Sequence, residues 1–404
     1  MIICAIQIGS SRILAIAASK DVRNGQLSNI QIESEPARDC ISHGCITNVE
    51  QAAGHFRSLI QKLSNRMRAT ISSAYLGIGG MSLHSLIQLP SVQLPDYDVL
   101  ASEAIDGNQY QLTIGQKHLR QRAMAAMERA GLRVADVIAL PQATACILND
   151  IERQHGCVLV DMGAGTTTVA IYKNNDLRHL AVIPLGGDSV SYDIQSAGCS
   201  YDDAERIKIE WSNVAQEINS ESSANSSASM FADKALPFPL SKLNNIAFCR
   251  YEEIAANIQH QIEQSGLKGQ LDAGCIVTGG AAMQSGLTAL LGRTLGVSHV
   301  EIRAYSERAL LGSERKPHLT NALALLSFCA DDCLAPVSAP ATSVAANHAA
   351  SPQAKRPTPD GQITLDIPDS EPDTPDPTTN YRPDSHPIRD SIGRFVKDLF
   401  TGQK

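Results

Sequence analysis

Residues 157–172 read CVLVDMGAGTTTVAIY, and this stretch decides the fold. An apolar run ends at Asp161, a glycine-bearing turn occupies 163–167, and a second apolar run begins at Val169. Runs of β-branched and aliphatic residues on both sides of such a turn predict a β-hairpin. The stretch therefore predicts two adjacent strands with an acidic residue at the end of the first.

The same arrangement occurs at the start of the chain. Residues 2–8 form an apolar run, Gly9, Ser10 and Ser11 follow, and residues 13–18 are apolar again. The strand–turn–strand unit thus occurs twice at corresponding places, although the sequence between the copies is not visibly repeated. Two α/β lobes with a cleft between them are the natural prediction.

Apolar periodicity predicts further elements in both halves. In the first half these are helices at 49–68 and 116–130 with strand character at 74–87. In the second half the predicted strands are 180–185 and 275–277, and the predicted helices are about 188–197, 201–217, 241–265 and 284–295. The Ser/Asn/Ala-rich stretch 219–240 predicts a surface loop.

Composition excludes several classes of function. The net charge of −8 and the aromatic content of 4% argue against nucleic acid as a partner, because phosphates need cations and unpaired bases need stacking platforms. No uninterrupted apolar run is long enough to span a bilayer. The ten cysteines include no CxxC and no zinc-ligand spacing with histidine, so we expect structural thiols in a reducing cytoplasm.

The end of the chain changes character twice. Eleven of the 19 prolines fall within 335–387, which predicts a disordered linker. Residues 388–404 then place apolar side chains on one helical face with basic residues beside it, a pattern typical of a helix that lies in a membrane surface. The residues predicted to bind the membrane are Ile388, Ile392, Arg394, Phe395, Val396, Lys397, Leu399 and Phe400.

Three glycine turns carry the predicted chemistry. They are the turn at 9–11, the turn at 163–167 and a TGG turn at 278–280. Turns without Cβ atoms let backbone N–H groups approach phosphate oxygens. An aspartate at the end of the preceding strand can hold a hydrated Mg²⁺. One such turn is a weak signal, but the order and separation of the three resemble the actin superfamily.

Within that superfamily the chain resembles the FtsA family over residues 1–334 and again at 388–404. The resemblance rests on Tyr75–Gly80 (YLGIGG), Ile183–Asp188 (IPLGGD), Asp203–Lys208 (DAERIK) and Arg250–Ile254 (RYEEI), and above all on the proline-rich linker that ends in an amphipathic helix. It implies an α/β, actin-like (ribonuclease H-like) two-lobed ATPase fold. The implied domains are a first lobe at 1–150, a second lobe at 151–334, the linker at 335–387 and the membrane helix at 388–404.

The resemblance also implies ATP and Mg²⁺ as cofactors. The nucleotide-binding residues that it implies are Gly9, Ser10, Ser11, Asp161, Gly163, Gly165, Thr166, Thr167, Glu205, Lys208, Gly279 and Gly280, with Asp161 as the metal residue. Glu205 and Lys208 match the helix whose Glu and Lys approach ribose and adenine in the family, whereas the bare spacing would also fit a surface pair.

The function implied is that of a cell-division protein, peripheral at the cytoplasmic face of the membrane and located at the septum. Such a protein tethers FtsZ filaments to the membrane and helps to assemble the division ring. The implied partners are the C-terminal peptide of FtsZ, anionic inner-membrane lipids and further copies of the chain in filaments. Arg206, Lys208 and Arg250 offer positive charge for an acidic peptide.

Two departures from the family bear on function. Relatives carry Asp where this chain has Gln7, and often where it has Thr168, which predicts slow or negligible ATP hydrolysis because metal positioning is weakened. The inserted subdomain, at about 88–130, is shorter than in the family and should contain a Pro/Asp segment, a polar stretch and one helix. Its shortening leaves self-association and later division partners open.

Two alternatives remain. The first is an enzyme, either an active actin-fold ATPase or a sugar kinase, for which the sequence identifies no catalytic carboxylate. The second is a membrane-associated actin-like scaffold that is not specific to FtsZ. The amphipathic tail argues against the kinase, since a soluble kinase has no use for it.

Overall fold

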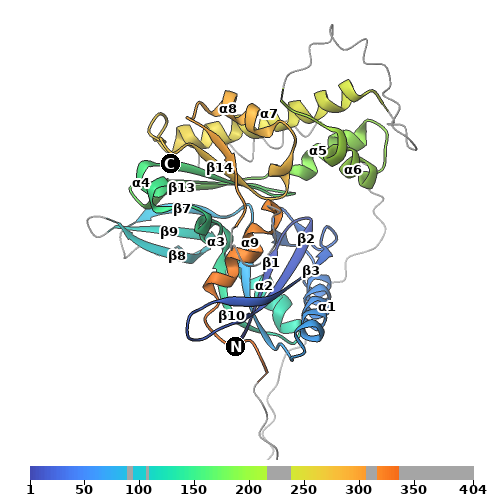
Figure 1. Ribbon diagram of the computed structural model, residues 1–404, viewed down its shortest axis with the longest axis vertical. Helices are drawn as coiled ribbons and strands as arrows, with labels where there is room; N and C mark the ends of the chain where they lie inside the picture. Colours follow the sequence, from blue (N-terminus) through green and yellow to red (C-terminus); the bar gives the residue numbers. More distant parts are fainter. Residues whose placement is uncertain (89–93, 106–108, 216–237, 306–315, 336–404) are drawn as a thin grey trace, which may run out of the picture. The chain divides into compact units, whose positions relative to one another are not determined.

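The computed structural model describes residues 1–88, 94–105, 109–215, 238–305 and 316–335, all within the compact unit Met1–Ala339. The predicted linker at 335–387 and membrane helix at 388–404 lie outside the described residues, apart from position 335. The described part contains two five-stranded sheets, each flanked by helices, and a three-stranded sheet beside them (Figure 1). A two-stranded sheet is formed by β4 (Ile41–Ser42) and β5 (Cys45–Ile46).

The first-lobe sheet has the strand order β10-β6-β1-β2-β3. Its strands are β1 (Ile2–Ile8), β2 (Arg12–Lys20), β3 (Leu27–Pro36), β6 (Ser73–Ile78) and β10 (Arg133–Ala139). The first three strands run antiparallel, whereas β6 lies parallel to β1 and β10 lies parallel to β6. The predicted hairpin at 2–18 is therefore present.

The second-lobe sheet repeats this order as β13-β12-β11-β14-β15. Its strands are β11 (Cys157–Met162), β12 (Thr167–Lys173), β13 (Asp176–Ile183), β14 (Cys275–Thr278) and β15 (Val300–Ile302). Again the first three strands are antiparallel and the last two are added in parallel. The matching topology confirms the predicted duplication.

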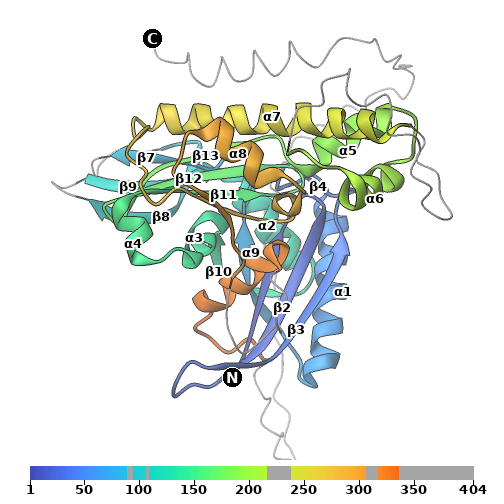
Figure 2. The ribbon, with the colours of Figure 1, turned by 45° about the horizontal axis from the view of Figure 1, so that its top comes forward.

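Helices cover the sheets as their apolar faces require. The described α-helices are α1 (Val49–Met67), α2 (Lys117–Arg129), α3 (Leu140–Thr144), α4 (Asp150–His155), α5 (Gly187–Ser196), α6 (Tyr201–Trp211), α7 (Leu240–Gln264), α8 (Leu287–Leu295) and α9 (Thr320–Leu325). In α1, Asn48 caps the first turn, Arg68 ends the helix in a left-handed conformation, and Phe56 and Leu59 are buried. Figure 2 shows α7 and α8 on one face of the second-lobe sheet.

One predicted helix was too long at its end. The helix expected at 201–217 ends at Trp211, because Ser212 adopts an extended backbone. The Ser212 hydroxyl donates to the Lys208 carbonyl and accepts from the Gln284 side-chain amide, which anchors the chain where the helix stops.

The polar stretch of the predicted inserted subdomain contributes strands to a sheet. Strands β7 (His84–Gln88), β9 (Gln109–Gln116) and β8 (Tyr97–Ile105) form a three-stranded antiparallel sheet in that order. The Leu180 backbone N–H donates to the Ser85 hydroxyl at 2.8 Å, which joins this sheet to β13 of the second lobe. The predicted inserted subdomain therefore contains a sheet of its own.

The chain returns to the first lobe near its described end. Leu323, Leu325 and Cys329 belong to the same buried core as Ile3 and Ile6 of β1. The predicted range 151–334 assigned this stretch to the second lobe, but its packing places it in the first lobe. Both ends of the described chain therefore build the first lobe.

Candidate functional site

A cavity of about 640 Å³ lies where the carboxyl ends of β1, β11 and β14 meet. Ligands of open α/β sheets commonly bind outside such strand ends. Ten of the twelve residues predicted to bind nucleotide line this cavity: Gly9, Ser10, Ser11, Asp161, Gly163, Thr166, Glu205, Lys208, Gly279 and Gly280. The three glycine turns, which are far apart in sequence, thus face one space.

Gly165 and Thr167, the other two predicted residues, do not appear on the cavity wall. A Cβ atom on Gly165 would lie 2.7 Å from the Ser10 hydroxyl, so glycine here lets the two hairpin turns approach each other. The buried Thr167 hydroxyl donates to the Leu185 carbonyl at 2.9 Å. Both residues therefore position the turn at 163–167, Gly165 against the turn at 9–11 and Thr167 against Leu185.

Asp161 is the acidic group at the end of β11. Its Oδ2 accepts a hydrogen bond from the Asn321 side chain at 2.7 Å, and Asn321 in turn accepts one from the Thr144 hydroxyl at 2.6 Å. Burial raises the pKa of Asp161, and the bond from Asn321 opposes that effect only in part. No ion pair within the described residues neutralises this carboxylate, so a bound cation would be favourable.

The surroundings of Asp161 fit a hydrated Mg²⁺. Gln7 lines the same cavity, and its buried Oε1 has no hydrogen-bond partner in the described part of the chain. Gly279 has φ +94°, and a Cβ atom there would lie 2.5 Å from Asp161 Oδ1, so only glycine leaves room beside the carboxylate. Hard cations prefer oxygen ligands and keep several bound waters. The unpaired Gln7 amide oxygen is placed to accept a hydrogen bond from such a water.

Glu205 and Lys208 form an ion pair at the cavity, in which the lysine is buried and the glutamate side chain is 31% exposed. Lys208 is 5% exposed, and its Nζ donates to Glu205, to the Ser191 hydroxyl and to the Gly187 carbonyl. Glu205 also accepts from the Ser191 hydroxyl. The pair is therefore held in place on α6 with one side toward the cavity, as nucleotide contact requires.

Two apolar residues at the cavity were missed by the sequence reasoning. Ile209 and Met283 both line it, and they are 70% and 58% exposed. Exposed apolar side chains beside the Gly280 turn offer a surface for a flat ring. On α6, Ile207 and Lys208 are buried and Ile209 is exposed. An apolar residue on the exposed side of this helix is the one sequence signal that could have identified Ile209.

No helix in the described part of the chain is long and apolar enough to cross a membrane. The eight residues predicted to bind the membrane, between Ile388 and Phe400, lie outside the described residues. Their role stays a prediction.

Comparison with solved structures agrees with the fold. The type IV pilus biogenesis complex PilM–PilN matches 81% of this chain and 98% of its own chain at 16% identity, with a TM-score of 0.61. MreB5 of Spiroplasma citri, bound to ADP, matches 81% of this chain and 95% of its own at 12% identity, with a TM-score of 0.53. The chain has the actin-like two-lobed α/β fold.

Sequence comparison reaches the family. The family model described as "Cell division protein FtsA" matches residues 158–324. FtsA of Porphyromonas gingivalis is 31% identical over 352 residues, which cover 75% of this chain and 73% of the relative. FtsA of Pseudomonas aeruginosa is 25% identical and matches 81% of this chain and 88% of its own. The chain therefore belongs to the FtsA family of cell-division proteins.

Proposed function

We propose that this protein binds ATP with Mg²⁺ in its cleft and tethers FtsZ filaments to the inner face of the cytoplasmic membrane at the septum. The observation that carries the nucleotide part is the gathering of three glycine turns, Asp161 and the Glu205–Lys208 pair around one cavity. An ADP-bound neighbour of the same fold supports it. Membership of the FtsA family supports the role in division.

Each group of residues at the cavity would contact a different part of the nucleotide. The N–H groups of the turns at Gly9 and Gly163 would bind phosphate oxygens, and the Ser10 and Thr166 hydroxyls would add donors. Glu205 would accept from the ribose hydroxyls, while Gly280 lets the base approach the backbone. Mg²⁺ would supply charge neutralisation for the phosphates, with Asp161 orienting its water shell.

Turnover is proposed to be slow. Gln7 contributes a neutral amide oxygen and Thr168 a hydroxyl at the positions where two carboxylates would fix the metal and its waters. Hydrolysis depends on this positioning more strongly than binding does. Bound ATP would then act mainly as a structural element: it would stabilise the arrangement of the two lobes that binds it, by shifting the equilibrium toward that arrangement.

The tether is proposed from the sequence of the tail. Residues 388–404 would lie on anionic inner-membrane lipids, and a linker of about 50 residues spans on the order of 40 Å as a flexible coil. This reach lets the folded part bind the C-terminal peptide of FtsZ below the bilayer. Self-association into filaments is a further proposal, which rests on the family alone.

Each of the three basic residues predicted to offer positive charge to the FtsZ peptide forms an ion pair within the chain. Lys208 is buried against Glu205, Arg206 pairs with Asp203 and Glu210, and Arg250 pairs with Asp193 and Glu253. A peptide carboxylate would have to compete with these partners. The peptide contacts are therefore left unassigned.

Isothermal titration of the full chain with ATP in Mg²⁺ tests the nucleotide site. We expect one ATP per chain and about tenfold weaker binding by Glu205→Gln, since a hydrogen bond to a charged group is lost. Glu263→Gln is the matched control, because Glu263 does not line the cavity and pairs with Lys268 on the surface. Equal affinity of the two variants, or no binding at all, would overturn the assignment.

A further inference from the structure

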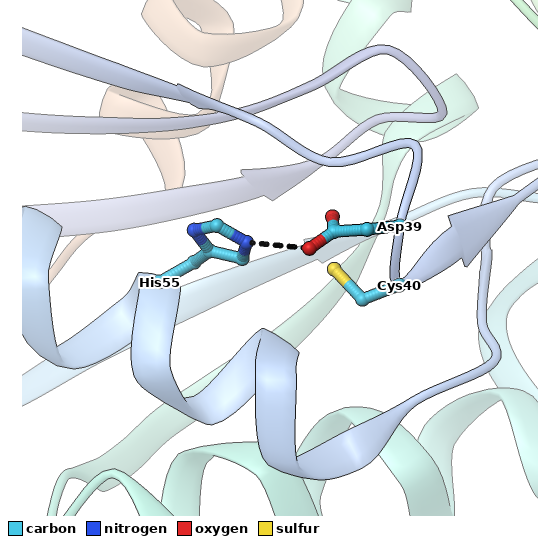
Figure 3. A group of neighbouring side chains, drawn as sticks. All are labelled: Asp39, Cys40 and His55. Atoms are coloured by element: carbon cyan, nitrogen blue, oxygen red, sulfur yellow. Dashed lines mark ion pairs between the residues drawn. The ribbon is translucent and has the colours of Figure 1, made fainter.

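A second group of chemically reactive side chains lies away from the nucleotide cavity. Asp39 and Cys40 occupy the turn between β3 and β4 (Ile41–Ser42), and His55 projects from α1 (Figure 3). One ligand atom from each of the three residues lies within 4.8 Å of the others. Figure 3 shows the His55 ring, the Asp39 carboxylate and the Cys40 sulfur directed toward a common point.

The orientation of His55 is fixed from behind. Its Nδ1 lies 2.6 Å from Glu35 Oε2, so the ring donates this N–H to the carboxylate and presents the lone pair of Nε2 on the other side. Glu35 is itself held by Ser58 and by Lys62 at 2.7 Å. A carboxylate behind a histidine is the arrangement that orients metal-bound histidines in proteins.

The distances are close to those of a tetrahedral zinc site. His55 Nε2 and Asp39 Oδ2 are 3.5 Å apart. Ligands of a tetrahedral Zn²⁺ are separated by about 3.3–3.6 Å, given bonds of about 2.0 Å to nitrogen or oxygen and 2.3 Å to sulfur. Since the ligand atoms lie within 4.8 Å of one another, the sulfur needs to approach by no more than about 1.5 Å. Asp39 is half-exposed, which gives an ion a path from solvent.

We propose that Asp39, Cys40 and His55 bind one Zn²⁺ and that a water completes its coordination. Thiolate, imidazole and carboxylate together select a borderline metal such as zinc over Mg²⁺ or Ca²⁺. No sequence pattern predicts this site, since Cys40 and His55 are fifteen positions apart and follow no known ligand spacing. Folding of the β3–β4 turn onto α1 brings them together.

A plain ion-pair network is the competing explanation. His55 would then be shared between Glu35 and Asp39, and Cys40 would be a buried thiol that donates to the Ala37 carbonyl at 3.5 Å. Burial, together with the Asp39 carboxylate, raises the pKa of Cys40 to about 12, so zinc must displace a proton from the thiol. The two explanations predict different metal content.

The site adjoins the cleft. Arg38, directly before Asp39, contacts Asp188 and Tyr201 of the second lobe. Zinc bound at 39–40 would fix the backbone of this turn and so limit the positions that Arg38 can take. Metal binding is nevertheless a property of the first lobe and does not depend on the proposed nucleotide site.

The test uses the full chain after removal of metal with a chelator. Zn²⁺ is titrated against a chromophoric competitor, and Co²⁺ serves as a spectroscopic probe because a thiolate ligand gives it a charge-transfer band. We expect one equivalent of Zn²⁺ per chain and a cobalt spectrum with a thiolate band. Cys40→Ser should abolish the band, and Cys199→Ser, a remote partly buried thiol, should leave it unchanged.

Two further variants guard against a folding defect. Asp39→Asn changes a half-exposed side chain and should weaken zinc binding at least tenfold while the thermal unfolding of the metal-free protein stays the same. His55→Gln should weaken it as strongly. Absence of zinc binding by the parent, or affinity unchanged in Cys40→Ser and Asp39→Asn, would overturn the proposal in favour of the ion-pair network.

Discussion

Arg38 of the first lobe donates a hydrogen bond to Asp188 of the second lobe at 3.0 Å. The same guanidinium contacts the Tyr201 hydroxyl at 2.6 Å and lies 4.3 Å from the centre of the Tyr201 ring. Asp188 also lines the nucleotide cavity, at the first turn of α5. One arginine therefore joins the two lobes beside the proposed ATP site.

Loss of this connection should make nucleotide leave faster. Arg38→Met is expected to raise the rate of ATP dissociation about two- to fivefold, the range for a half-exposed ion pair, with little change in thermal unfolding. Stopped-flow release of a fluorescent ATP analogue measures it. Arg66→Met, which removes an ion pair with Glu33 inside the first lobe, is the control. Equal rates for both variants would show that Arg38 does not hold the cleft.

The ionised Asp161 carboxylate should lower the free energy of unfolding when the cleft holds no nucleotide. Burial raises its pKa in the folded state above the ordinary 3.8, so the folded protein binds this proton more tightly than the unfolded chain does. The contribution is unfavourable at neutral pH and disappears as pH falls through the folded pKa. Asp161→Asn should therefore raise the unfolding midpoint by about 2 °C at pH 7 without nucleotide, and the gain should vanish in acid.

The same substitution should abolish the stabilisation by ATP and Mg²⁺. The asparagine side chain would no longer offer the charged oxygen that orients the water shell of the metal, so the midpoint of Asp161→Asn should no longer rise with nucleotide concentration. Thermal scans with and without Mg²⁺–ATP give both results from one protein. A variant that is less stable when empty, yet still stabilised by ATP, would contradict the role given to Asp161.

Gly279 should resist replacement. Alanine at this position needs a strained backbone, and its methyl group would strike Asp161 and the Met162 carbonyl. We expect Gly279→Ala to lower the free energy of unfolding by about 1–3 kcal/mol and to weaken ATP binding. Gly292→Ala, in α8 with open space around it, should be neutral or slightly stabilising in chemical denaturation. Similar stability of the two variants would refute this.

Gln7 can be tested by restoring a carboxylate. Gln7→Asp should increase Mg²⁺-dependent ATP hydrolysis by about tenfold or more, because a charged ligand orients the metal water shell better than an amide. Phosphate release under single-turnover conditions measures this step. Gln111→Asp should not raise hydrolysis, because Gln111 is a buried glutamine that does not line the cleft and whose side chain has no hydrogen-bond partner among the described residues. Unchanged turnover in Gln7→Asp would mean that some other group limits hydrolysis.

Local patterns predicted most of the framework. The apolar runs that flank Gly9 and Gly163 identified both hairpins, and helical periodicity found α1 and α7 close to their true ends. The order of the glycine turns then placed their residues around one cavity. These signals are local in sequence, and tertiary packing did not override them.

The failures arose where the deciding partner is distant in sequence. Strands β8 and β9 were not predicted, because their sheet is half-exposed and their sequences are rich in polar residues. The end of α6 depends on Gln284, and the contact between Arg38 and Asp188 joins residues 150 positions apart. Neither the link between the lobes nor the proposed zinc ligands has a signature in the chain order.

The central claim is that this FtsA-family chain joins FtsZ to the membrane, and co-sedimentation with anionic liposomes tests it most directly. FtsZ from the same organism is mixed with ATP and either the full chain or a version that ends at Pro387. We predict that FtsZ pellets with lipid only when the full chain is present. If the full chain pellets with lipid and FtsZ stays in solution, the tethering function is contradicted.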